Sequence, residues 1–192
     1  MKELVMSEKQ IVEACARIGK ELTERLKDEE KFPLFICVMK GALYFMAELR
    51  KHCDFPSLDS FIQVTSYQGT HTTGHVVLSY APKVDLEGRT VVLVEDVVDT
   101  GLSMEFLVNH FKTKGNAKQV LICALFDKKP ARKVPVEVDY VGMTLEENKF
   151  LLGFGLDYNG LGRNVPYVYV PTPEEIAQMD KQIALRGEHL DE

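Results

Sequence analysis

A continuous apolar run that passes into acidic residues and then into a short polar turn most constrains how this chain can fold. Residues 91–103 read Val-Val-Leu-Val-Glu-Asp-Val-Val-Asp-Thr-Gly-Leu-Ser. Unbroken Val and Leu are typical of a strand buried on both faces of a parallel sheet, and ligands bind beyond the carboxyl ends of such strands. We therefore expect the strand to end at the adjacent acids Glu95 and Asp96, with their carboxylates at the ligand-binding edge.

The residues after these acids offer the components of an anion-binding loop. Thr100 and Ser103 carry hydroxyl groups, and Gly101 lets a ligand approach the backbone closely. A helix predicted over Met104–Phe111 would add the free N–H groups of its first turn. The glycine patterns of the Walker loop and of the dinucleotide fingerprint do not match this segment. Acids next to a phosphate-binding loop instead suit a ligand that also offers hydroxyl groups or a metal, such as a phosphorylated ribose.

Helical and strand patterns alternate along the rest of the chain. Ser7–Gln10 has the form of a capping box, and apolar residues then recur at helical spacing as far as Leu26. Further strands are predicted at 34–39, 61–66, 76–80, 119–126, 136–141, 150–153 and 167–170, and further helices at 42–51 and from 173 onward. The alternation predicts an α/β fold with a mainly parallel sheet covered on both faces by helices. Residues 1–192 are expected to form a single domain with a small appended lobe.

Composition limits the kinds of protein that the chain can be. A formal net charge of −6 argues against a nonspecific nucleic-acid binder. Met1–Gln10 lacks an apolar leader, and no run approaches the roughly 18 apolar residues of a membrane helix. We therefore expect a cytoplasmic protein without a membrane partner. The four cysteines show no Cys-x-x-Cys spacing, so we interpret them as buried free thiols.

The first motif carries a family resemblance. Residues 94–103 resemble the phosphoribosyl pyrophosphate signature of the type I phosphoribosyltransferase family, and Asp99 resembles its 6-oxopurine branch. Further ordered matches are Val-Met-Lys-Gly at 38–41, Thr-Ser-Tyr at 65–67, Phe-Asp-Lys-Lys at 126–129 and Lys-Phe-Leu-Leu-Gly-Phe-Gly-Leu-Asp-Tyr-Asn at 149–159. The resemblance covers nearly the whole chain. It implies the type I phosphoribosyltransferase fold, with a twisted sheet flanked by helices and a small hood formed by the N- and C-terminal segments.

The resemblance also implies an activity. A member of this branch is a magnesium-dependent purine salvage enzyme. It would transfer the 5-phosphoribosyl group from phosphoribosyl pyrophosphate to N9 of hypoxanthine or guanine, giving IMP or GMP plus pyrophosphate. Its partners would be these small molecules and, because the family forms dimers and tetramers, further copies of itself.

The ribose, its 5-phosphate and the metal would be held around the first motif. The implied ribose and phosphate ligands are Glu95, Asp96, Asp99, Thr100, Gly101, Leu102 and Ser103. Glu95 and Asp96 would accept hydrogen bonds from ribose hydroxyls directly or through Mg²⁺, and Asp157 would be a further metal contact through water. The plainer interpretation is that the first two acids end a strand and that Asp157 is a turn residue.

The resemblance assigns pyrophosphate to Lys40, Gly41 and Arg163. Charge builds up on a departing diphosphate, so prepositioned donors there lower the barrier. In the family the peptide bond between the two loop residues, here Lys40 and Gly41, is cis. The plainer interpretation of Lys40 is a solvated lysine at a strand end. Glycines at 155, 160 and 162 predict a loose segment before Arg163.

The purine would be recognised by a third group of residues. Asp99 would act as general acid/base at N7. Lys128 would donate to the 6-oxo group, since an ammonium only donates and therefore opposes the amine of adenine. Phe150 would stack on the base, Leu151 would offer backbone groups, and Asp157 would complete the purine set, although spacing alone also allows Phe150 to be a core residue. The other basic residues near Lys128 are interpreted as solvated: Lys129, Arg132 and Lys133.

Ser66 and Tyr67 resemble the start of a flexible loop that closes over the site and excludes water. His71 and His75, in the same polar segment, are too weak a pattern for a metal site. Two alternatives stay open. One is a noncatalytic regulator that binds phosphoribosyl pyrophosphate and contacts RNA or DNA, which Asp99 and the acidic charge disfavour. The other is a phosphate-binding α/β protein that takes another sugar nucleotide.

Overall fold

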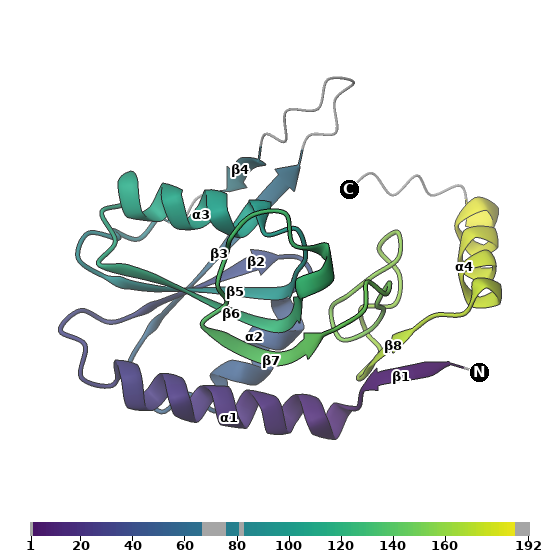
Figure 1. The fold of residues 1–192 in the computed structure, drawn as a ribbon, viewed down its shortest axis with the longest axis horizontal. Helices are drawn as coiled ribbons and strands as arrows, with labels where there is room; N and C mark the ends of the chain where they lie inside the picture. Colours follow the sequence, from purple (N-terminus) through teal and green to yellow (C-terminus); the bar gives the residue numbers. More distant parts are fainter. Residues whose placement is uncertain (1, 67–75, 81–82, 187–192) are drawn as a thin grey trace.

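The computed structural model describes residues 2–66, 76–80 and 83–186, and a six-stranded sheet lies at its centre (Figure 1). In chain order its strands and helices are α1 (Glu8–Leu26), β2 (Leu34–Met39), α2 (Leu43–Arg50), β3 (Leu58–Ser66), β4 (Val76–Tyr80), β5 (Thr90–Val98), α3 (Leu102–Thr113), β6 (Gln119–Lys128) and β7 (Tyr140–Leu145). The strand order is β4-β3-β2-β5-β6-β7. All neighbours pair in parallel except β4, which runs antiparallel to β3 at one edge.

Helices cover both faces of the sheet, as the alternating pattern predicted. α1 and α2 pack on one face, where their apolar side chains join Phe35, Val92 and Cys123 in one buried cluster (Figure 1). α3 packs on the opposite face through Leu107 and Phe111, which belong to a second cluster. Because β2, β5 and β6 are buried on both sides, their sequences are almost continuously apolar.

The central strand β5 is longer than predicted. It pairs with β2 on one side and with β6 on the other, and it continues through both acids to Val98. The expectation that the strand ends at Glu95 and Asp96 is therefore wrong. The reason is that β6 also runs on, so that Val98 pairs with Asp127. The first residue beyond the strand is consequently Asp99.

The strand predicted to start at Val136 begins instead at Tyr140. Before that point, the guanidinium of Arg132 donates to the carbonyl of Val136. The carboxylate of Asp139 accepts a hydrogen bond of 2.8 Å from the N–H of Ile122. The Arg132 side chain thus satisfies a carbonyl of this segment, and the Asp139 carboxylate accepts from a β6 N–H that a backbone partner would otherwise need to bond.

The strand predicted over residues 150–153 is reduced to a single bridge. Leu152 and Tyr169 exchange N–H to carbonyl hydrogen bonds of 2.9 and 3.0 Å. Gly153 and Gly155 then adopt φ angles of 104° and 97°. These values turn the chain out of the extended region, so a strand cannot continue.

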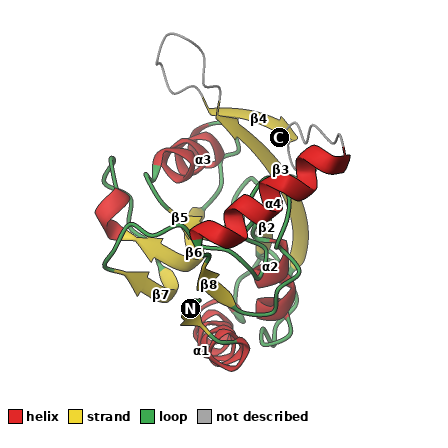
Figure 2. Cartoon of the chain, turned by 90° about the vertical axis from the view of Figure 1, so that its right-hand side faces the viewer, coloured by secondary structure: helices red, strands yellow, loops and turns green. Residues whose placement is uncertain are grey.

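The two ends of the described chain meet beside the main sheet. β1 (Glu3–Met6) and β8 (Val168–Val170) pair antiparallel, and α4 (Pro173–Arg186) follows β8 (Figure 2). α4 starts as predicted, because the backbone N–H groups and side chains of Thr172 and Glu175 bond each other reciprocally. β1 was not predicted: its partner lies at the other end of the sequence, so no local pattern indicates the pairing.

The predicted N-terminal cap is confirmed, and the prediction of buried free thiols is confirmed for Cys15, Cys37 and Cys123. Ser7 accepts a hydrogen bond from the N–H of Gln10, whose side chain accepts one from the N–H of Ser7. All four cysteines are free, and Cys53 is half-buried while the others are buried. Burial raises the pKa of the Cys15 thiol to about 12, so this group stays protonated near neutral pH.

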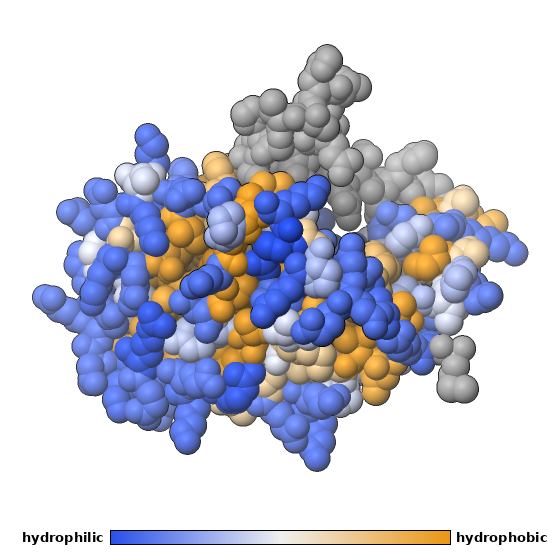
Figure 3. Space-filling view, viewed as in Figure 1, coloured by the Kyte–Doolittle hydropathy of each residue, from blue (hydrophilic) through white to orange (hydrophobic). Residues whose placement is uncertain are grey.

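The surface carries mixed polarity. On the face shown in Figure 3, hydrophilic residues cover most of the periphery and hydrophobic residues lie in patches between them. Leu4, Phe61 and Leu185 are among the exposed large apolar side chains. Within residues 2–66, 76–80 and 83–186, no helix has the length and apolar character needed to span a membrane.

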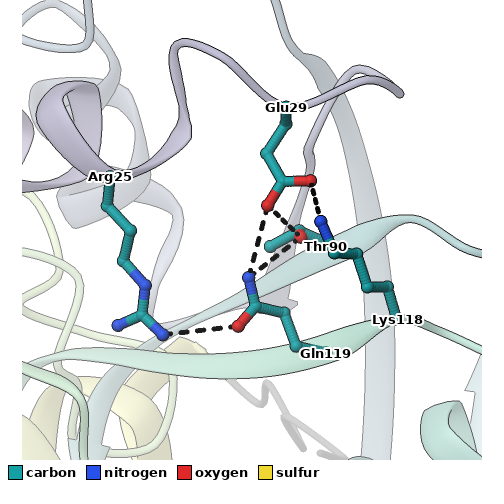
Figure 4. A network of polar contacts seen from close by, with 5 residues as sticks. All are labelled: Arg25, Glu29, Thr90, Lys118 and Gln119. Carbon is teal, nitrogen blue, oxygen red and sulfur yellow. Dashed lines mark hydrogen bonds and ion pairs between the residues drawn. The ribbon is translucent and has the colours of Figure 1, made fainter.

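A polar network joins the segment after α1 to the amino ends of β5 and β6 (Figure 4). The hydroxyl of the fully buried Thr90 donates to the Glu29 carboxylate at 3.1 Å, and Lys118 forms an ion pair of 2.8 Å with the same carboxylate. Gln119 donates to the Thr90 hydroxyl at 3.1 Å and accepts from Arg25 at 3.3 Å. The network lies at the opposite end of β5 from the acids, so we expect it to serve stability.

Replacing Glu29 by alanine should lower the free energy of unfolding by about 1–3 kcal/mol, because the buried Thr90 hydroxyl would lose its acceptor. Urea unfolding followed by circular dichroism would measure the change. Glu30→Ala is the matched control, since that side chain is exposed. Equal stability of the two variants would contradict the role given to the network.

Candidate active site

A cavity of about 320 Å³ opens beside the carboxyl ends of β2 and β5. Its wall is made by these strands, by the loop between β5 and α3, by the first turn of α3 and by the segment before β8. The predicted site residues that line it are Gly41, Glu95, Asp96, Asp99, Thr100, Gly101, Ser103, Asp157 and Arg163. One cavity therefore brings together residues expected to meet ribose, phosphate, metal and pyrophosphate.

The two acids of β5 lie side by side in a half-buried position. Glu95 accepts a hydrogen bond of 3.2 Å from the N–H of Asp96, which itself accepts one of 2.7 Å from the N–H of Val97. Burial, followed by the negative charge of Asp96, raises the pKa of Glu95 well above its usual value. A side chain at Gly41 would overlap the Asp96 carboxylate, so glycine lets the turn after β2 approach the acids. Ligand hydroxyls or a cation would relieve the repulsion between the two carboxylates.

The loop after β5 has the geometry of an anion-binding turn. Gly101 is the N-cap of α3 and has a φ of 85°, a conformation that favours glycine. α3 begins at Leu102, two positions before the predicted Met104, and the N–H of Leu102 donates to the Thr100 hydroxyl at 3.4 Å. The remaining N–H groups of the first turn suit an anion.

Asp99 and Lys128 lie close together, although Asp99 follows β5 and Lys128 is the last residue of β6. The Lys128 ammonium is 3.8 Å from an Asp99 carboxylate oxygen. The Lys128 side chain is 10% exposed, whereas that of Asp99 is 51% exposed. A nearly buried cation thus stands beside an accessible acid, which suits a ligand that accepts at one atom and exchanges a proton at another.

Asp157 and Arg163 are held by a tightly turned segment. They form an ion pair of 2.7 Å, and Arg163 also donates to the carbonyl of Gly155 at 2.7 Å. The N–H of Gly160 donates to Asp157 at 2.6 Å. A side chain at Gly155 would overlap the carbonyl of Gly41. The prediction of a loose segment is therefore wrong, because these glycines provide positive φ angles and close backbone contacts.

The turn after β2 differs from expectation in one bond. The cis peptide bond joins Met39 to Lys40. The expectation that it joins Lys40 to Gly41 is therefore wrong by one bond. β2 ends at Met39, and the cis bond thus lies where strand becomes turn. Lys40 is exposed and does not line the cavity, whereas Gly41 does.

Among the predicted purine-binding residues, Lys128, Phe150 and Leu151 lie outside the cavity lining, as does Leu102, a predicted phosphate ligand. Phe150 is 49% exposed and meets the ring of Tyr158 edge-on, with centroids 6.0 Å apart. It faces a separate apolar hollow that also contains Ile176. Leu151 is buried, and Leu102 is an exposed first residue of α3. The structure therefore joins Asp99 with Lys128 but leaves Phe150 and Leu151 apart from that pair.

Most of the expected flexible loop lies outside the residues that the structure describes. Ser66 is the last residue of β3. Tyr67, His71 and His75 lie outside the described residues. Closure of this loop stays a prediction.

The acids match the donor chemistry of Mg²⁺ without forming a closed cage. In the part of the chain that the structure describes, no cluster of three or more His, Cys, Asp and Glu could hold a metal by itself. Magnesium typically takes one or two carboxylates together with substrate oxygens and water, and the adjacent Glu95 and Asp96 provide such a pair. Asp157 is already bonded to Arg163 and Gly160, which fits a contact through water.

Arg132 was interpreted as solvated, and this is wrong. Its side chain is 16% exposed and pairs with Asp127, which is buried at the end of β6. A buried carboxylate needs a cationic partner. An acid directly after an apolar run, with an arginine soon after it, is the sequence signal that would have indicated this pair. Lys129 and Lys133 are exposed, as predicted.

Comparison with known proteins places this arrangement in a family. The model of the phosphoribosyl transferase domain matches residues 5–159. This chain belongs to the phosphoribosyltransferase family. The matched range contains every predicted site residue except Arg163. The type I phosphoribosyltransferase fold inferred from the first motif is confirmed.

Relatives of this phosphoribosyltransferase lie in the hypoxanthine-guanine branch. The hypoxanthine-guanine phosphoribosyltransferase of Streptococcus pyogenes is 40% identical over 171 residues, which cover 88% of this chain and 93% of the relative. A hypoxanthine phosphoribosyltransferase structure from Staphylococcus aureus has a TM-score of 0.84 at 31% identity and covers 91% of this chain and 94% of that one. The Trypanosoma cruzi enzyme in complex with the product IMP has a TM-score of 0.81 at 32% identity, over 90% and 95% of the two chains.

Proposed function

We propose that this phosphoribosyltransferase transfers the 5-phosphoribosyl group of phosphoribosyl pyrophosphate to N9 of hypoxanthine or guanine, forming IMP or GMP and pyrophosphate. The observation that carries the proposal is the pairing of Asp99 with Lys128 at 3.8 Å, directly beside the anion-binding loop. An acid and an ammonium at this spacing suit N7 and the 6-oxo group of one purine. The names of the relatives support the same reaction.

The ribose phosphate would lie along the β5–α3 connection. The backbone N–H groups of Gly101 to Ser103 and the hydroxyls of Thr100 and Ser103 would bind the 5-phosphate. Glu95 and Asp96 would accept hydrogen bonds from the ribose hydroxyls, since acceptors in a half-buried cavity favour ligands that donate. This arrangement would hold C1 at a fixed distance from Asp99.

The diphosphate would leave on the side of the cavity lined by Gly41 and Arg163. As the bond to C1 lengthens, charge develops on the phosphate oxygens, and donors fixed beforehand stabilise it. Arg163 keeps N–H groups beyond those bonded to Asp157 and Gly155, and Lys40 would approach from the exposed turn. Mg²⁺, when bound at Glu95 and Asp96, would neutralise part of the charge of the leaving diphosphate.

The base would be recognised by four residues. Asp99 would hold or take the N7 proton as N9 becomes nucleophilic, and Lys128 would donate to the 6-oxo oxygen. Phe150 would cover the ring and the backbone of Leu151 would meet its edge. Phe150 is exposed, which suits an aromatic that covers a ligand better than one that fills the core. Closure of a loop that begins at Ser66 and Tyr67 would exclude water.

We also propose that the enzyme acts in the cytoplasm as a homodimer or homotetramer and takes no nucleic acid as partner. The net charge of −6 supports the last point. Size-exclusion chromatography with light scattering would establish the oligomeric state.

The reaction has a direct test. Purified protein with phosphoribosyl pyrophosphate, magnesium chloride and hypoxanthine or guanine should form IMP or GMP and pyrophosphate in equal amounts, measured by chromatography. EDTA should stop product formation. No turnover of hypoxanthine, guanine or xanthine would refute the proposal, and calorimetric binding of phosphoribosyl pyrophosphate without turnover would favour a regulator.

A further inference from the structure

Arg132 occupies a junction between the two strands that carry the proposed purine-binding groups. Its guanidinium donates to the carbonyl of Asp99 at 3.1 Å and to that of Val98 at 3.3 Å. The same group pairs with the carboxylate of Asp127 and donates to the carbonyl of Val136. One side chain thus bonds the end of β5, the end of β6 and the segment that leads into β7.

The register of the sheet explains why this junction matters. Val98 pairs with Asp127, so the next residues are Asp99, just beyond β5, and Lys128, the last residue of β6. Their carboxylate and ammonium are 3.8 Å apart. Because Arg132 bonds both members of the preceding pair, it fixes the point from which Asp99 and Lys128 project.

The same segment also closes the anion-binding loop from outside the cavity. The backbone N–H of Lys133 donates to the carbonyl of Thr100 at 2.9 Å. A side chain at Gly101 would come within 2.9 Å of the Arg132 Cδ, so the loop and the arginine stem lie in direct contact. Arg132 is absent from the cavity lining, and its guanidinium already donates to several protein acceptors, so we assign it no direct contact with a ligand.

We infer that Arg132 is a positioning residue, which holds Asp99 and the phosphate loop at the distance from Lys128 that the reaction requires. The inference rests on the proposed function. A guanidinium is suited to this task because its donors lie in one rigid plane and reach several acceptors at once, whereas an ammonium acts as a point charge. Lysine at this position would keep the charge but lose the simultaneous bonds.

The test compares Arg132→Lys and Arg132→Met with the wild-type enzyme and with Lys112→Met, a change at an exposed lysine outside the cavity lining. Thermal unfolding would establish that each variant is folded, and calorimetry would give the Kd for IMP. Arg132→Lys should lower kcat about 100-fold, as a displacement of reacting groups by about 1 Å does, and should weaken IMP binding less. Lys112→Met should match the wild-type enzyme.

Chemical rescue separates positioning from a loss of folding when each kcat is corrected for the folded fraction of the variant. Guanidinium ion added at concentrations that do not unfold the protein should restore part of the kcat of Arg132→Gly and none of that of Arg132→Lys. Folded Arg132→Lys with wild-type kcat, or a loss that disappears once rates are corrected for the folded fraction, would overturn the inference. Absence of turnover in the wild-type enzyme would instead refute the proposed function, so the two failures are distinguishable.

Discussion

Replacing Asp99 by asparagine should lower kcat for IMP formation by about 10²–10⁴-fold, the range typical of losing a general acid/base. The amide keeps the shape of the side chain but cannot hold or release the N7 proton. Folding should be unaffected, because the Asp99 side chain is 51% exposed. Steady-state rates with hypoxanthine at saturating phosphoribosyl pyrophosphate would measure the effect.

Asp54→Asn is a suitable control, since that side chain is also exposed and lies outside the cavity lining. The Kd for IMP should change little in Asp99→Asn, because the loop N–H groups that bind phosphate stay in place. A kcat within about threefold of the wild-type value would exclude Asp99 as the group that moves the proton, since general acid–base catalysis contributes at least about 10²-fold.

The site could be predicted from the sequence wherever it depends on one continuous segment. The apolar run of β5, its acids and the Thr-Gly turn lie within a few residues of one another. The apolar pattern and the turn residues therefore indicate a strand followed by a helix whose first turn binds an anion. The cavity contains Glu95, Asp96, Asp99, Thr100 and Gly101 for this reason.

The parts that could not be predicted depend on contacts between distant segments. β5 extends to Val98 only because β6 continues beside it, and β1 forms only because β8 returns to it. Whether Arg132 is solvated or paired is decided by the place of Asp127 in the sheet, not by the basic residues around it. Likewise, the segment around Gly155 is closely packed because the carbonyl of Gly41 lies against this glycine.

Replacing Lys128 by methionine should lower kcat/KM for hypoxanthine by roughly 10–100-fold, since a hydrogen bond to a charged donor contributes about 1.5–3 kcal/mol. Methionine keeps the length and apolar stem of this nearly buried side chain. Adenine should be a poor substrate of the wild-type enzyme, because its 6-amino group meets an ammonium that only donates. In the variant that repulsion is absent, so the ratio of kcat/KM for hypoxanthine to that for adenine should fall further than the rate itself.

Lys129→Met is the matched control, because Lys129 is the next residue and is exposed. Because Lys128 lies 3.8 Å from Asp99, a slow variant could have lost either its contact with the 6-position or the correct placement of Asp99. The substrate ratio separates these two effects. Both purines carry N7, so any disturbance of Asp99 lowers both rates and cancels in the ratio. Only a change at the 6-position alters the ratio itself. Equal ratios in wild type and Lys128→Met would therefore mean that another group reads the 6-oxo atom, even if the variant is slow.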